Sequence, residues 1–132
     1  MLKIRIFMAL INVLVVDDDK LIQQIAGAAL ASRGVGVFTV YTSIQADLIL
    51  QRERVDVIIC DVLMDEEDGL SYCKRLQDAG CRVPVILLSC LSDPVTIMIG
   101  KSSGAAAYMI KPFDTEELYQ RVLQTAGSRT TS

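Results

Sequence analysis

Five short apolar runs rich in β-branched residues recur along the chain, and longer segments with helical spacing separate them. Runs of this length predict β-strands, and the scarcity of polar residues within them indicates strands that are buried on both faces. The expected strands cover residues 12–16, 37–41, 55–60, 84–88 and 106–110.

Segments with the spacing of amphipathic helices follow the strands. In the first three of these segments, the positions expected to face the core are Ile22, Ile25, Ala26, Ala29 and Leu30, then Ile44 and Leu48, then Leu70, Cys73 and Leu76. Thr42 and Ser43 are the expected cap of the second helix. The first helix is expected to end near Gly34, and the third to begin near Gly69 and to end at Gly80, because glycine commonly terminates helices.

The last two helices carry start signals in the sequence. Asp93 can cap a helix whose first residue is Pro94 and which reaches about Ser103. Asp114 is expected to cap a fifth helix that ends at Gly127. Strict alternation of five strands with five helices predicts the α/β class, with a doubly wound five-stranded parallel sheet and helices on both faces.

The chain is long enough for one domain. Its 132 residues, 52% of them hydrophobic, can form a continuous core, which we expect over residues 11–126. Residues 1–10 are interpreted as an apolar leader that runs into the first strand. No small-residue cleavage site follows this stretch, which is too short to span a membrane, so no membrane association is expected. Residues 127–132 are expected to be a tail or linker.

Composition excludes several classes of function. A formal charge of −3 disfavours direct nucleic-acid binding. The absence of histidine removes the commonest general base and zinc ligand. Four cysteines lack C-x-x-C spacing, so we expect buried free thiols and a cytoplasmic protein. They are Cys60, Cys73, Cys81 and Cys90.

Chemically active side chains lie at the carboxyl ends of the expected strands. Asp17 and Asp18 follow the first strand, Asp61 the third, Ser89 the fourth and Lys111 the fifth. Parallel strands end at one edge of their sheet, where ligands bind, so these residues are expected to face one pocket.

The charges in this pocket indicate its ligand. Carboxylates crowded together repel one another unless a cation lies between them, and an all-oxygen ligand set suits Mg²⁺, the expected cofactor. Mg²⁺ and Lys111 would balance the charges of Asp17, Asp18 and Asp61. Such a neutral site can admit a phosphoryl group.

Five motifs occur in a fixed order along the chain: residues 13–18 (VLVVDD), residues 57–61 (VIICD), Asp68-Gly69, Ser89 and residues 111–113 (KPF). In this order they resemble the receiver domains of the response regulators of two-component signalling, including the chemotaxis regulators. The resemblance extends over residues 12–126. It implies the flavodoxin-like fold of that family, with strand order 2-1-3-4-5.

The resemblance implies a role for each site residue. Asp61 would accept a phosphoryl group from a phosphohistidine, and Lys111 would pair with Asp61 and then with the phosphoryl group. Ser89 and Tyr108 would form the family's switch pair. The implied magnesium ligands are Asp17, Asp18, Asp61 and the backbone carbonyl of Leu63.

A receiver domain is a signalling phosphoacceptor, not an enzyme with a separate substrate, and it catalyses its own phosphorylation and dephosphorylation. The implied partners are a histidine kinase or phosphotransfer protein, and an output domain or partner protein outside this chain. Phosphorylation would switch the face formed by the last two helices and the strand over 106–110. A homodimer that forms on phosphorylation is a further implied partner.

One departure from the family lies after Asp61. Asp65 occupies a position where the family commonly has proline, and residues 65–68 (DEED) make this loop acidic. We interpret the loop as solvated, in preference to a second cation site.

Three other functions can be weighed against this interpretation. The order Asp17-x-Asp19, Ser89, Lys111 also resembles motifs of haloacid dehalogenase-type phosphatases, but that family takes its nucleophile from the first strand and needs a further acidic pair after the lysine. A receiver-like module that is not phosphorylated usually lacks the acceptor, the acidic pair or the lysine, and all are present here. A flavin-binding protein would need a phosphate-binding loop rich in Ser, Thr and Gly after the first strand.

Overall fold

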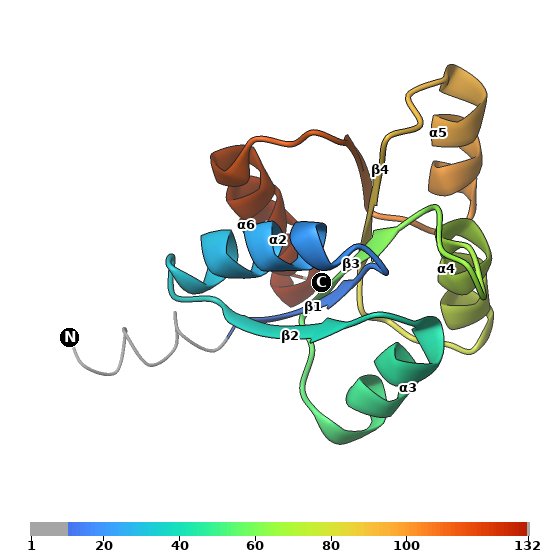
Figure 1. The fold of residues 1–132 in the computed structure, drawn as a ribbon. Helices are drawn as coiled ribbons and strands as arrows, with labels where there is room; N and C mark the ends of the chain where they lie inside the picture. Colours follow the sequence, from blue (N-terminus) through green and yellow to red (C-terminus); the bar gives the residue numbers. More distant parts are fainter. Residues whose placement is uncertain (1–10, 132) are drawn as a thin grey trace.

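The computed structural model describes residues 11–131 of the chain, and the side chains of residues 11–127. Five parallel strands form one sheet in the order β2-β1-β3-β4-β5, which confirms the predicted topology (Figure 1). The strands are β1 (Asn12–Val16), β2 (Gly36–Val40), β3 (Val57–Asp61), β4 (Val85–Ser89) and β5 (Ala107–Ile110).

In the described part of the chain, five helices cover the two faces of the sheet. They are α2 (Lys20–Ala31), α3 (Ser43–Arg52), α4 (Gly69–Asp78), α5 (Pro94–Ser102) and α6 (Thr115–Thr131). Helices α2 and α6 pack on one face, and α3, α4 and α5 lie on the other (Figure 1). Within residues 11–131, no helix combines the length and the apolar composition that a membrane span requires.

Alternating strand residues build two separate cores. On β1, Val13 and Val15 face α2 and α6, whereas Leu14 and Val16 face the helices of the opposite layer. All four side chains are buried, because both faces of the strand are covered. Two-sided burial explains why the strands are apolar throughout.

Helix ends follow the expected signals. The side chains of Thr42 and Asp93 cap α3 and α5 by accepting hydrogen bonds from the amides of Gln45 and Thr96, at 3.2 and 2.9 Å. Residues with positive φ angles, which favour glycine, follow three of the helices. They are Gly34, Gly80 and Gly104.

Three apolar residues expected in the core are exposed. Ile25 of α2 and both Ile44 and Leu48 of α3 face solvent. In α3 the buried apolar position is Ala46, and Ile49 and Leu50 pack partly against the core. Apolar residues occur on more than one side of this helix, so tertiary packing decides which side is buried.

Two further expectations about the chain need correction. Cys60 and Cys73 are buried, but Cys81 is only half-buried and Cys90 is exposed, because Cys90 lies in the loop after β4. Helix α6 continues past Gly127 to Thr131, since a glycine costs a helix only about 1 kcal/mol. The leader expected over residues 1–10 lies outside the described residues.

Candidate functional site

Three carboxylates meet at the carboxyl edge of the sheet. Asp17 and Asp18 follow β1, and Asp61 is the last residue of the neighbouring strand β3. The residues just before Asp17 and Asp61, Val16 and Cys60, are paired across the two strands. Each carboxylate offers one oxygen, and these oxygens all lie within 4.8 Å of one another. Asp17 and Asp61 are buried, whereas Asp18 is exposed. Among the described residues, this is the group whose geometry could hold a metal ion.

Asp19, the third acidic residue in the run, belongs to the helix instead. Its side chain accepts a hydrogen bond from the amide of Leu21 at 2.9 Å and so caps α2. Its own amide donates to Oδ1 of Asp17 at 2.8 Å. The start of α2 therefore orients the Asp17 carboxylate, while the Asp19 carboxylate stays outside the cluster.

Lys111 brings a positive charge into the cluster from the far edge of the sheet. It follows β5, and its Nζ atom lies 3.0 Å from Oδ2 of Asp17 and 3.3 Å from Oδ1 of Asp61. Burial alone would lower the pKa of Lys111, but the hydrogen bond and charge of Asp17, together with Asp61, raise it. Lys111 therefore remains a cation at neutral pH.

Asp61 is held in an environment that resists its ionisation. Burial is the main cause, the charge of Asp17 adds to it, and together they raise the pKa of Asp61 to about 6. The charge of Lys111 and a hydrogen bond of 3.3 Å from the Leu63 amide to Oδ1 of Asp61 act in the opposite direction. A buried carboxylate pair with one compensating lysine is short of positive charge, which a bound divalent cation would supply.

Ser89 and Tyr108 are connected through one residue between them. Ser89, the last residue of β4, is fully buried, and its Oγ accepts a hydrogen bond of 3.1 Å from the Leu91 amide. Tyr108 of β5 is half-buried, and its hydroxyl donates to the Leu91 carbonyl at 2.8 Å. The two expected switch residues therefore bind the backbone amide and the backbone carbonyl of the same residue, Leu91, in the loop after β4.

Two residues near the cluster have roles that sequence reasoning did not assign. Gln23 of α2 is buried, and its Nε2 donates to the carbonyls of Asp17, at 2.9 Å, and of Val40. A single glutamine in a helix gives no signal of this role. Gly69 lies so close to β3 that a Cβ atom there would be 2.1 Å from the Asp61 carbonyl oxygen. The Asp-Gly pair in the sequence is the signal for that contact.

Comparisons with known proteins agree with this geometry. A protein family described as "Response regulator receiver domain" matches residues 13–123. "Response regulator MprA" of Mycobacterium bovis is 30% identical over 112 residues, which are 85% of this chain and 49% of the relative. The chain thus spans about half the length of this relative.

Solved structures of similar domains have the same fold. The Francisella response regulator 1452 receiver domain is 32% identical, with a TM-score of 0.84 over 89% of this chain and 97% of that chain. The "BeF3 Activated DrrB Receiver Domain" is 31% identical, with a TM-score of 0.77 over 88% of this chain and 97% of that one. The flavodoxin-like order of the sheet and the acidic cluster at its edge are those expected from the sequence. This chain belongs to the receiver domain family of two-component response regulators.

Proposed function

We propose that Asp61 accepts a phosphoryl group from a phosphohistidine of a histidine kinase or phosphotransfer protein. The observation that carries this proposal is the position of Asp61, whose carboxylate lies beside Asp17 and 3.3 Å from the Lys111 ammonium. An oxygen of Asp61 attacks phosphorus, and the bond between phosphorus and the histidine nitrogen breaks. The electron pair of that bond returns to the imidazole, and an acyl phosphate is formed.

The donor set around Asp61 fits Mg²⁺. Asp17, Asp18 and Asp61 offer carboxylate oxygens within 4.8 Å of one another, and no nitrogen or sulfur ligand lies among them. We assign these three residues and the backbone carbonyl of Leu63 as the magnesium ligands. When bound, Mg²⁺ would neutralise carboxylate charge and stabilise the charge on the phosphoryl oxygens.

The chain's own residues supply the remaining catalysis, in the manner of a phosphoacceptor that promotes its own modification and its hydrolysis. The Lys111 ammonium can move from the Asp61 carboxylate to a phosphoryl oxygen. It would stay paired during this movement, because its Nζ atom also lies 3.0 Å from Oδ2 of Asp17. The Gln23 side chain holds the backbone of Asp17 in place through a hydrogen bond to its carbonyl. The positive charge is thus in place before the reaction begins.

The Ser89 hydroxyl is the proposed first part of the switch. If Ser89 Oγ turns to a phosphoryl oxygen, the Leu91 amide loses its partner, and Tyr108, bonded to the Leu91 carbonyl, is affected next. The loop that carries Leu91 leads into α5. Phosphorylation would therefore bias two arrangements of this loop, α5 and β5.

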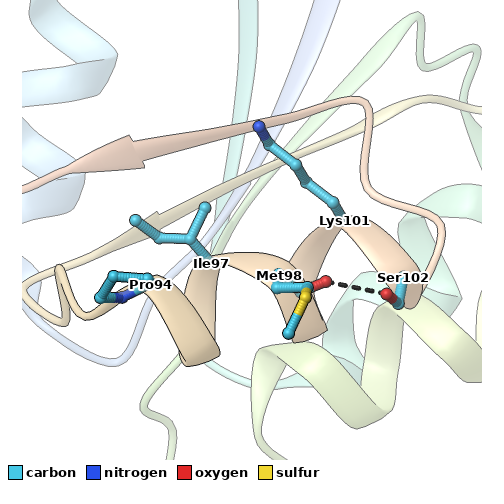
Figure 2. A pocket seen from close by; sticks show the side chains of 5 residues that line it. All are labelled: Pro94, Ile97, Met98, Lys101 and Ser102. Atoms are coloured by element: carbon cyan, nitrogen blue, oxygen red, sulfur yellow. Dashed lines mark hydrogen bonds between the residues drawn. The ribbon is translucent and has the colours of Figure 1, made fainter.

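The outer surface of α5 is the proposed site of output. Val95, Met98 and Ile99 are exposed there. Figure 2 shows a pocket on this helix, lined by Pro94, Ile97, Met98, Lys101 and Ser102. We assign this surface, with β5 and α6, to contact with an output domain, a partner protein or a second phosphorylated copy.

Incubation with acetyl phosphate and Mg²⁺ tests the proposal. Mass spectrometry of the intact protein and its peptides should find one phosphoryl group, on Asp61, and none in Asp61→Asn. The matched control is Asp19→Asn, which removes a neighbouring carboxylate outside the cluster. Modification at Asp17 would support the phosphatase interpretation instead, and unchanged incorporation into Asp61→Asn would contradict the proposal.

A further inference from the structure

Arg75 of α4 joins three parts of the fold. We define the acidic loop as residues 62–68, between β3 and α4. Two nitrogens of Arg75 hold both carboxylate oxygens of Glu67 in this loop, Nη2 to Oε1 at 2.9 Å and Nε to Oε2 at 3.1 Å. Nη2 also lies 3.0 Å from Oδ2 of Asp47 on α3. One side chain thus links α3, α4 and the acidic loop.

A buried tyrosine anchors this arrangement in the core. Tyr72 is fully buried, its hydroxyl donates to Oδ1 of Asp47 at 2.9 Å, and the Arg75 guanidinium lies 4.8 Å from its ring centroid. The side chains of Glu67 and Asp47 are only 24% and 31% exposed to solvent. Bidentate pairing on an aromatic ring, with a further carboxylate in the network, is stronger than an isolated surface ion pair.

The acidic loop is closed at its ends and rich in like charges between them. The Gly69 amide donates to the Val62 carbonyl at 2.8 Å, which brings the loop ends together. Residues 65–68 are all acidic. Their mutual repulsion favours an expanded loop unless a cation opposes it. Arg75 supplies that cation from the adjacent helix.

The loop lies beside the phosphoacceptor cluster. Glu67 and Asp18 line the same small pocket. At the start of the loop, the Leu63 amide donates to Oδ1 of Asp61. A shift of the loop would therefore move the backbone of Leu63, whose amide is a hydrogen-bond partner of the Asp61 carboxylate.

We propose that Arg75 is a positioning residue for the phosphoacceptor site. It holds the acidic loop against α3 through Glu67 and Asp47, and thereby fixes Leu63 for cation binding at Asp61. Its effect on cation affinity rests on the proposed function.

The sign of the effect separates positioning from simple electrostatics. Removal of the positive charge of Arg75 should strengthen cation binding if charge alone matters. Loss of a positioning contact should weaken it, because an outer residue that orients a ligand commonly contributes a factor of about ten or more to affinity. Lys74 is the matched control, since it is adjacent on α4 and pairs with Asp78, at 2.9 Å, away from the loop.

The test is a Mg²⁺ titration followed by the amide resonances of Leu63 and Asp61. Arg75→Gln should raise the dissociation constant about tenfold, Arg75→Lys should recover part of the loss, and Lys74→Gln should leave it unchanged or slightly lower. Equal or tighter binding by Arg75→Gln would overturn the proposal. Failure of the wild-type chain to bind Mg²⁺ would instead contradict the proposed magnesium site.

Amide hydrogen exchange in the metal-free protein tests the positioning independently of the cation. Arg75→Gln should accelerate exchange at Leu63 and Gly69 about tenfold, with Val15 in the centre of β1 unchanged. If Arg75→Gln does not fold, Glu67→Gln removes the same clamp from the loop side and should give the same pattern. Unchanged rates at both loop amides, or equal acceleration at Val15, would show that Arg75 does not position the loop.

Discussion

The hydroxyl of Tyr108 donates a hydrogen bond of 2.8 Å to the carbonyl of Leu91, although Tyr108 lies on β5 and Leu91 lies in the loop after β4. The Leu91 amide in turn donates to Ser89 Oγ. Both polar groups of the Leu91 backbone are therefore held by side chains from neighbouring strands. This loop can change its arrangement only if at least one of these two bonds is broken.

Loss of the Tyr108 hydroxyl should weaken the loop. Tyr108→Phe leaves the Leu91 carbonyl without this partner and should lower the free energy of unfolding by about 1 kcal/mol. Urea unfolding measures the change. Tyr119→Phe is the control, because its half-buried ring lies beneath Arg33 and its hydroxyl has no hydrogen bond among the described residues. Equal losses in the two variants would contradict a specific role of the Tyr108 bond.

The inward position of the Tyr108 ring depends on Gly100. A Cβ atom at Gly100 would lie 2.9 Å from Cδ2 of Tyr108 and 3.1 Å from Cδ1 of Leu87. We expect Gly100→Ala to displace the ring and to destabilise the domain by about 1–3 kcal/mol, despite the better helix propensity of alanine.

Thermal unfolding and the tyrosine ring resonances follow this change. Gly127→Ala is the matched control, since a Cβ atom there meets nothing within 4 Å, and the substitution should stabilise α6 by up to about 1 kcal/mol. Stabilisation by Gly100→Ala as well would mean that the Tyr108 ring can move aside freely.

Much of the acidic cluster could be predicted from the sequence because it depends on topology. Parallel strands that neighbour one another end at one edge, so Asp17 and Asp61 come close once β1 and β3 are placed side by side. Lys111 follows β5, two strands from β3, and its long side chain reaches both carboxylates along the same edge. The caps of Thr42 and Asp93 were equally local, since a side chain and an amide three residues later decide them.

Long-range packing was not predictable in the same way. Arg75 meets Asp47 across 28 residues and Glu67 across 8, and no periodic pattern signals either pair. Ile44 and Leu48 have helical spacing, yet they face solvent, because the position of α3 on the sheet decides which side is covered. Local patterns fix the elements, whereas their contacts need the assembled fold.

The neighbouring residues Asp18 and Asp19 should differ in their effect on cation binding. Asp18→Asn removes a carboxylate of the cluster and should weaken Mg²⁺ binding about tenfold or more. Asp19→Asn removes the same charge from the cap of α2, where asparagine also caps well, and should change the affinity little. Mg²⁺ titration of both variants measures the difference. Equal weakening would show that only the summed charge matters.

Metal-free protein should become more stable when Asp61 is neutralised. The pKa of Asp61 is raised from 3.8 to about 6 in the folded protein, so folding favours the protonated form. The ionised carboxylate therefore costs stability, and this cost develops as the pH rises from about 4 to 6.

Asp61→Asn should exceed the wild type by about 1–2 kcal/mol above pH 6, after allowance for solvent screening, and the difference should vanish near pH 4. Urea unfolding in the presence of a chelator measures it, and added Mg²⁺ should restore the wild type. A difference that is constant from pH 4 to 7 would contradict the raised pKa.

Leu63 and Leu91 should protect phosphorylated Asp61 from water. Leu63 lies two residues after Asp61 and Leu91 two residues after Ser89, and each donates its amide to the side chain of that residue. The Leu63 side chain is exposed, whereas Leu91 is half-buried. Neither can orient an attacking water by a hydrogen bond. We therefore expect a long-lived acyl phosphate.

Leu63→Asn tests this protection because it introduces a polar group and leaves the backbone ligand in place. Since an oriented water can raise a rate by orders of magnitude, even partial orientation should shorten the lifetime about tenfold. Loss of the phosphoryl group after removal of acetyl phosphate is followed by mass spectrometry. Leu21→Asn, at an exposed leucine of α2, is the matched control and should match the wild type. If Leu63→Asn loses its phosphoryl group no faster than this control, the leucine does not shield the site.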